Sequence, residues 1–131
     1  MASILANAGR AIITNALKLG ATEPKQAGWG TGAGTSGVTD TTLFTEKALD
    51  LATGTGSRTA ATTSQVTTSV TNDTYQAVVT LTASAGGTAT NFGLFDNAAI
   101  GSGNLFLKSD FTGVVLAAGD SITFTAKLQF T

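Results

Sequence analysis

The chain has no cysteine and no histidine among its 131 residues. Without cysteine it has no disulfides, thiolate nucleophiles, zinc–cysteine sites or iron–sulfur clusters. Without histidine it lacks the side chain that most often serves as general base near neutral pH, which is also the commonest transition-metal ligand. We therefore predict that the protein is not an enzyme and that it holds no metal and no cofactor.

Charged residues are also scarce. They make up 11% of the chain, with a net charge of −1, against about 25% in typical soluble domains. The seven basic residues are scattered from Arg10 to Lys127. The sequence therefore has no basic patch for phosphate groups and predicts no nucleic-acid partner. Proteins this close to neutrality repel their own copies weakly and tend to associate.

Long apolar runs are missing as well. None approaches the ~18–20 residues that span a bilayer, which predicts no membrane partner. Segment 1–19 has some of the character of a signal peptide, but Asn7, Arg10 and Asn15 interrupt its apolar stretch. We therefore expect this segment to belong to the mature protein.

Proline occurs once, whereas threonine occurs 25 times. Threonine is β-branched and suits the pleated, half-exposed surface of a sheet. A surface of hydroxyl groups forms hydrogen bonds without strong charge, which suits closely packed neighbours. The length fits one domain. We expect residues 1–131 to form a single β-sandwich domain, in which 1–37 is an N-terminal arm or helix plus a glycine-rich loop.

Helical spacing is confined to two segments. Apolar residues recur at spacing four in residues 4–19, and Gly20 follows them, which predicts a helix. The apolar stripe consists of Ile4, Ala8, Ile12 and Ala16, with Leu5, Ile13 and Leu17 alongside. Residues 43–51 (LFTEKALDL) predict a second helix of about two turns, with Thr41 or Thr42 as its cap.

The segment from Gly28 to Gly37 is too rich in glycine for the interior of a strand or a helix. We expect it to be a loop that Trp29 anchors to the core. Gly32, Gly34 and Gly37 match G-x-G-x-x-G, which binds dinucleotides only between the strand and the helix of a βαβ unit. The sequence lacks that context, so we interpret the motif as part of a structural loop.

From Arg58 onward apolar and polar residues alternate. The clearest strands are 74–84 and 121–131, and weaker ones are 58–70, 90–96 and 104–111, with turns at 71–73 and 97–103. The inward faces of the two clearest strands consist of Tyr75, Ala77, Val79, Leu81 and Ala83, and of Ile122, Phe124, Ala126, Leu128 and Phe130. This pattern predicts a mainly β fold, an antiparallel β-sandwich or small barrel, with an N-terminal helix or arm.

Three other features have a structural and a functional interpretation. Asp96, Asp110 and Asp120 lie near predicted strand ends, which favours turn hydrogen bonds over a calcium site, because calcium needs denser acidic spacing. Asn72 begins a glycosylation sequon that we interpret as a turn. Core packing is favoured over a stacking platform for six phenylalanines. These are Phe92, Phe95, Phe106, Phe111, Phe124 and Phe130.

Three stretches of the sequence resemble a family of small virion proteins of tailed bacteriophages. The first is NAGRAIITNAL (7–17), followed by Pro24-Lys25 and GWGTG (28–32). The second is DTTLFTE (40–46), followed after Arg58 by a threonine-rich pair of strands. The third comprises NFGLFD (91–96), GNLFLK (103–108), AGDSI (118–122) and the final alternating strand.

The resemblance implies a jelly-roll-like sandwich with an N-terminal arm, and a location in the virion. We expect a capsid decoration (cement) protein on the capsid surface, bound to the major capsid protein or to copies of itself. The alternatives are a tail fibre, baseplate or adaptor component, or a carbohydrate-binding module. The arm either plugs one end of the sandwich or reaches a neighbouring chain. The expected partner contacts are Ile4, Leu5, Ile12, Ile13, Leu17 and Trp29.

Overall fold

The computed structural model describes residues 3–20 and 22–131. These residues form a mainly β fold with two antiparallel sheets and an N-terminal helix, as the sequence predicts. The elements in chain order are α1 (Asn7–Leu19), β1 (Gln26–Gly30), β2 (Glu46–Lys47), β3 (Thr59–Ala60), β4 (Thr62–Val66), β5 (Thr74–Thr82), β6 (Gly87–Phe95), β7 (Leu105–Leu116) and β8 (Ser121–Gln129).

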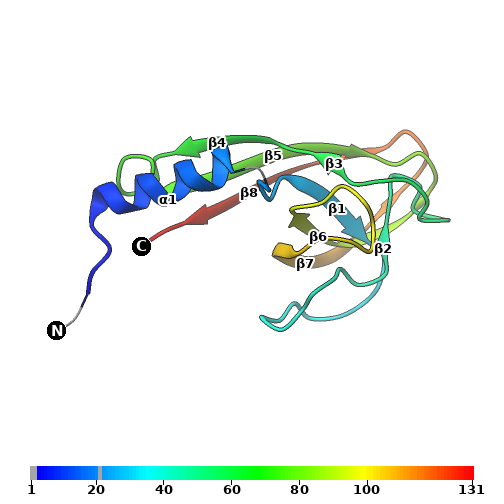
Figure 1. Ribbon diagram of the computed structural model, residues 1–131. Coiled ribbons are helices and arrows are strands. Elements are labelled where there is room, and N and C mark those ends of the chain that lie inside the picture. The colour runs from blue at the N-terminus through cyan, green and yellow to red at the C-terminus, as the bar shows by residue number, and fades with distance from the viewer. Residues whose placement is uncertain (1–2, 21) are drawn as a thin grey trace.

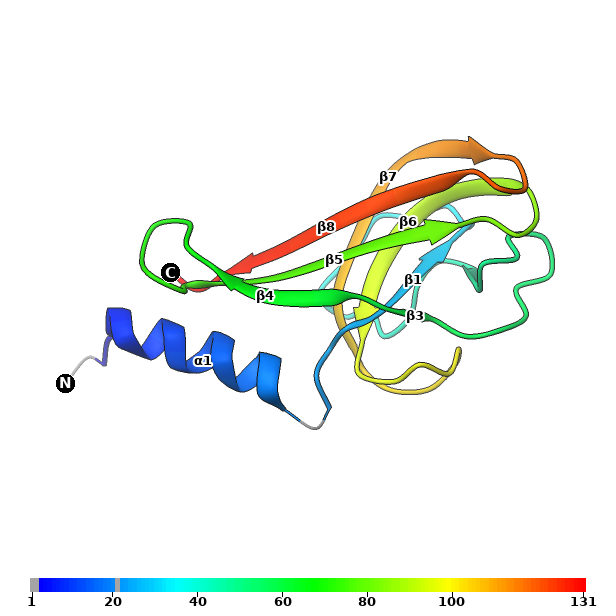
Figure 2. The same ribbon diagram turned by 90° about the horizontal axis from the view of Figure 1, so that it is seen from above.

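The two sheets face each other in a sandwich-like arrangement. The larger sheet has the order β2-β1-β6-β7, with β3 also paired to β1, and the smaller one has the order β4-β5-β8. The smaller sheet extends beyond the larger one as a long ribbon (Figure 2). Helix α1 runs alongside the extended part of this ribbon, next to β4 (Figure 1).

The core lies between the sheets and matches the predicted inward face of β5. Tyr75, Ala77, Val79, Leu81 and Ala83 are all buried. They pack with buried residues of the larger sheet, among them Trp29, Phe92 and Leu94. The period-two pattern therefore assigned the two faces of β5 correctly.

Strand β8 also has the predicted alternation and lies next to β5. Ile122 pairs with Leu81 and Phe124 with Val79. The inward-facing residues of β8 are only half-buried, whereas those of β5 are buried. The difference arises because β8 is the outer strand of its sheet and, among the residues that the structure describes, has no strand on its other side.

The prediction of a loop from Gly28 to Gly37 is wrong for its first three residues. Gly28, Trp29 and Gly30 belong to β1, which lies between β2 and β6 in the larger sheet. The glycines are needed because other groups approach the strand closely. A Cβ atom on Gly30 would overlap the backbone oxygen of Phe44, and one on Gly28 would lie 2.9 Å from Glu46 Oε1. Residues 31–37 form the predicted loop.

The helix predicted over residues 43–51 is also wrong. The chain there is extended at Glu46–Lys47, which pair with Gly30 and Trp29 of β1. Thr45 has a φ of 48°, which no α-helix allows. Long-range pairing with β1 and burial of Leu43, Ala48 and Leu51 decide the conformation instead of local propensity.

Candidate interaction surface

Helix α1 is held to the smaller sheet by polar contacts. Thr14 is its buried residue, and the Thr14 hydroxyl donates to the backbone oxygen of Asn72 at 2.7 Å. Gln65 on β4 donates through Nε2 to Thr14 Oγ1 at 2.7 Å and to the backbone oxygen of Ala11 at 3.0 Å. These contacts determine which face of α1 meets the sheet.

The predicted apolar stripe of the helix faces solvent. Ile4, just before α1, is 91% exposed and Ile12 is 68% exposed, and Ala8 and Ala16 are exposed as well. Leu19, seven residues after Ile12 and therefore on the same side, is 71% exposed. We call Ile4, Ala8, Ile12, Ala16 and Leu19 the α1 stripe. The stripe does not plug the end of the sandwich, which was one of the two alternatives.

The remaining predicted contact residues of the arm lie at the sides of the helix. Leu5 is 40% exposed, and Ile13 and Leu17 are half-buried. Leu17 packs against the hydrophobic core. Ile4 and Ile12 therefore present the larger part of their apolar surface to solvent and Leu5 a smaller part, whereas Leu17 contributes to the attachment of the helix.

The charges of α1 are all positive. The helix carries Arg10 and Lys18 and no acidic residue. The ion pairs among residues 3–20 and 22–131 involve neither of these two cations. Arg10 lies four residues before the buried Thr14, and its Nε is buried. The surface that α1 offers is therefore an apolar stripe with Lys18 as its nearer cation, and an acidic group would complement it.

The arm joins the sandwich at a fixed point. Glu23 is buried, forms an ion pair with Lys25 at 3.0 Å and accepts a hydrogen bond from the Thr63 hydroxyl. The Tyr75 hydroxyl donates to Glu23 at 3.4 Å. Burial, together with the negative charge of Glu23, raises the pKa of Tyr75 well above its usual value. These contacts hold the base of the arm against the core.

Trp29 anchors β1 to the core, which confirms its predicted anchoring role. Its side chain is 1% exposed, and its indole nitrogen donates to the backbone oxygen of Ala48 at 2.8 Å. The partner contact that the sequence predicts for Trp29 therefore has no accessible side chain in this structure. The fold uses this residue inside the sandwich.

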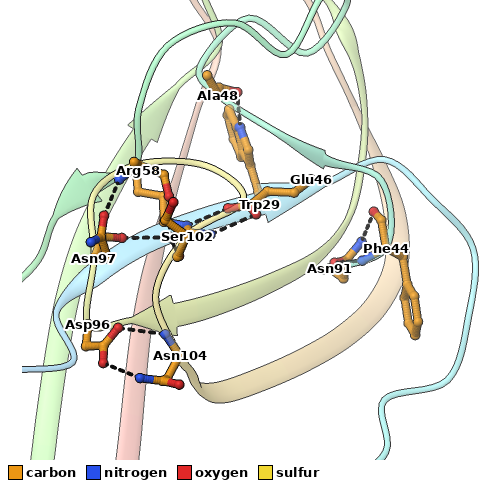
Figure 3. A network of polar contacts seen from close by, with 11 residues as sticks. Trp29, Phe44, Glu46, Ala48, Arg58, Asn91, Asp96, Asn97, Ser102 and Asn104 are labelled. Carbon is orange, nitrogen blue, oxygen red and sulfur yellow. Dashed lines mark hydrogen bonds and ion pairs between the residues drawn. The ribbon is translucent and has the colours of Figure 1, made fainter. Parts of the chain in front are cut away.

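A buried ion pair between Arg58 and Glu46 of β2 supports the larger sheet. No sequence pattern predicted this ion pair. Arg58 donates through Nε to Glu46 Oε1 at 2.6 Å and through Nη2 to Oε2 at 2.9 Å. Its Nη1 also donates to three backbone oxygens of the 97–103 turn (Figure 3). Its guanidinium lies over the ring of Phe95. The partners of Arg58 lie 12 to 44 residues away from it in sequence, so no local pattern could predict these contacts.

The aspartates have structural partners. Asp96 accepts from the backbone and the side chain of Asn104, which lowers the pKa of Asp96 (Figure 3). Asp120 accepts from Ala117 N–H in the turn before β8. The prediction that Asp110 lies near a strand end is wrong, because β7 continues to Leu116 and Asp110 accepts from Ser36 N–H, far away in sequence. In the described part of the chain, no group of three or more acidic residues is arranged to hold a metal ion.

The sequon residues form a turn, as predicted. Asn72 has a φ of 56°, and the buried Asp73 accepts hydrogen bonds from the N–H groups of Thr68, Ser69 and Val70. Burial by itself raises the pKa of Asp73, but these bonds and one from Gln129 outweigh it and lower the pKa well below the usual range. This carboxylate holds the β4–β5 loop together.

Five of the six phenylalanines serve the core as predicted, and some of them line its open side, whereas Phe130 is half-buried just after β8. Phe92 and Phe95 are buried, whereas Phe106, Phe111 and Phe124 are partly buried against the core. Phe111, Phe124 and Phe92 line a pocket of about 260 Å³ between β7 and β8. The sandwich is therefore open along the side where these two outer strands lie.

Comparisons with known proteins add no identification. No family model, curated protein or solved structure matches the chain. Among the described residues, no helix is both long and apolar enough to cross a membrane.

Proposed function

We propose that this protein is a non-enzymatic structural component of a tailed-bacteriophage virion, and that it decorates the outer shell by binding the major capsid protein. The observation that carries the proposal is the α1 stripe. An apolar helix face that the protein's own core leaves uncovered is typical of a docking surface. The resemblance of the sequence to small phage virion proteins is the reason for placing this docking surface in a virion.

The contact chemistry follows from α1. Docking of Ile4, Ile12 and Leu19 into an apolar groove would remove their side chains from water, at about 25 cal/mol per Å² of apolar surface. Lys18, the cation of α1 that lies nearer to the stripe, favours a groove with an acidic group at its rim. The sparse charge and the hydroxyl-rich sheet faces allow many copies to lie close together on one shell.

The benefit to the particle is thermodynamic. A protein that binds the assembled shell, and not the separated subunits, stabilises the shell by mass action. Neither a nucleophile nor a general base is needed for this task. The rings of Trp29 and Tyr75 are buried, so they offer no exposed platform for a sugar and give no support to the alternative of a carbohydrate-binding module.

The copy number per virion tests the proposed location. We expect hundreds of copies, which we would count by quantitative mass spectrometry against the major capsid protein. A density map of the intact particle would place α1 at the contact with the shell. A count of a dozen or fewer would contradict the decoration role and favour a tail fibre, baseplate or adaptor component.

A further inference from the structure

Strand β8 is a long and regular outer strand. Its nine residues pair with β5 from Ser121↔Thr82 to Gln129↔Thr74 without a bulge. The strand contains one charged residue, Lys127, and no proline. Proteins normally protect such edges with charges, prolines, bulges or a covering segment, because an unprotected edge pairs with other chains.

The other long edges of the two sheets are covered or interrupted. Strand β4 is contacted by α1 through Gln65. Strand β7 has two irregularities in its pairing with β6. The loop before β2 also lies against β7, with Ser36 bonded to Asp110 and Asp40 paired with Lys108 at 2.7 Å. In the described part of the chain, β8 has neither kind of protection.

The backbone bonds show which groups of β8 point outward. Phe130 N–H donates to the backbone oxygen of Asp73, and Ala83 N–H donates to that of Asp120. Both contacts follow the register of β8 with β5, so the even-numbered residues of β8 form the hydrogen-bonded pairs. Because such pairs alternate along antiparallel strands, the N–H and C=O groups of Thr123, Thr125 and Lys127 point away from β5.

Apolar side chains accompany these outward backbone groups. Ile122, Phe124 and Ala126 face the interior but are only half-buried, and Phe124 and Ala126 line the open pocket between β7 and β8. A strand added beside β8 would cover this apolar surface and bond the free backbone groups at the same time.

We infer that β8 is the surface through which two copies of this chain associate, with their β8 strands antiparallel across a two-fold axis. The two smaller sheets then form one continuous sheet of six strands. An isologous contact of this kind satisfies the same outward groups in both copies. The inference concerns a different surface from the α1 stripe and does not depend on the proposed function.

Charge selects a second copy as the occupant. Asp120 immediately precedes β8, and Lys127 lies near its other end. Both residues are exposed. Antiparallel pairing brings the end of each strand that carries Lys127 close to the turn of the other copy that carries Asp120, so that the charges at both ends of the contact are opposite in sign. A net charge of −1 adds little repulsion between the copies.

The test is sedimentation equilibrium of the full chain, with Thr125→Pro as the first variant. Proline at this position removes an outward N–H and no bond to β5, so the fold tolerates it at an edge. We expect wild type and the matched control Thr125→Ala to form dimers. Thr125→Pro should raise the dissociation constant about tenfold or more, because one hydrogen bond is lost in each copy.

Lys127→Glu provides a second test that leaves the backbone unchanged. It places like charges together at both ends of the contact, so the dimer should weaken. Added salt should then strengthen the variant dimer and weaken the wild-type dimer. A wild-type chain that stays monomeric up to about 0.5 mM, or a dimer that neither variant affects, would overturn the inference. A failure of the dimer inference would leave the proposed function untouched, because incorporation into virions through α1 is measured in a separate experiment.

Discussion

The ring of Phe92 on β6 stacks on the ring of Phe124 on β8, with centroids 4.3 Å apart and planes inclined by 16°. The pair joins the two sheets on the open side of the sandwich. Phe111 on β7 lies at 5.8 Å from Phe124 and completes a cluster of three rings. Packing on this side therefore depends in part on Phe111 and Phe124, which are only partly removed from water.

Phe124→Ala is expected to destabilise the fold by about 2–3 kcal/mol, which is less than for a fully buried phenylalanine because this ring is half-buried. Urea denaturation followed by circular dichroism measures the change. Val115→Ala, on the exposed part of β7, is the control and should change the free energy of unfolding little. Equal effects of the two substitutions would contradict the assigned packing.

Two glycine-to-alanine substitutions distinguish two reasons for requiring glycine, which are lack of space for a Cβ atom and a positive φ angle. Gly30→Ala should prevent β1 from pairing normally, because the new Cβ would overlap the Phe44 backbone oxygen. Gly101 has a φ of 81°, and a Cβ atom there would meet no neighbouring atom within 4 Å, so Gly101→Ala should cost only about 1 kcal/mol. Thermal melts of both variants test this, and a Gly30→Ala protein as stable as Gly101→Ala would contradict the strand assignment.

The parts of the fold that were predicted correctly are those with a strong local pattern. Alternation placed Tyr75 and Leu81 of β5 in the core, and spacing four located α1. Strand β1 could not be predicted, because its glycines look like a loop until Phe44 and Asn91 are known to approach Gly30. Residues 43–51 have helical composition, but their pairing with β1 overrides it.

The candidate surface was predicted only in part. Spacing identified the apolar stripe with Ile4 and Ile12, but it could not tell whether the sheet or the solvent would meet it. The contacts of Thr14 with Asn72 and Gln65 decide this, and they join residues far apart in sequence. The outward groups of β8 likewise depend on its register with β5, which no pattern in one strand can supply.

Removing one partner of the Arg58–Glu46 ion pair should lower the free energy of unfolding more than replacing both partners with apolar residues. Arg58→Met leaves the Glu46 carboxylate buried and unpaired, with an expected loss of about 3–5 kcal/mol. The double variant Arg58→Met/Glu46→Met should recover a large part of this loss, because no buried charge remains. Urea denaturation of both proteins is the measurement. A double variant less stable than Arg58→Met would contradict the explanation.

Asp73 should make stability depend on pH. Its pKa is lower in the folded than in the unfolded chain, so its contribution is complete above the unfolded pKa and is lost as the pH falls through the folded value. Asp73→Asn should therefore be less stable than wild type near neutral pH. The gap should narrow on acidification below about pH 4, where the unfolded carboxyl takes up its proton. A gap that urea denaturation finds unchanged with pH would contradict this role.

The incorporation of an Ile12→Asp variant into particles tests the central claim most directly. Ile12 is on the exposed α1 stripe, so the isolated protein should melt within a few degrees of wild type, whereas docking in an apolar groove would bury an unpaired carboxylate. The matched control is Val38→Asp, at a fully exposed position in the 31–45 loop. Each variant is co-expressed with wild type during phage growth and counted in purified virions by mass spectrometry. We predict a loss of about tenfold or more for Ile12→Asp and wild-type incorporation for Val38→Asp; equal incorporation of all three proteins would contradict the account.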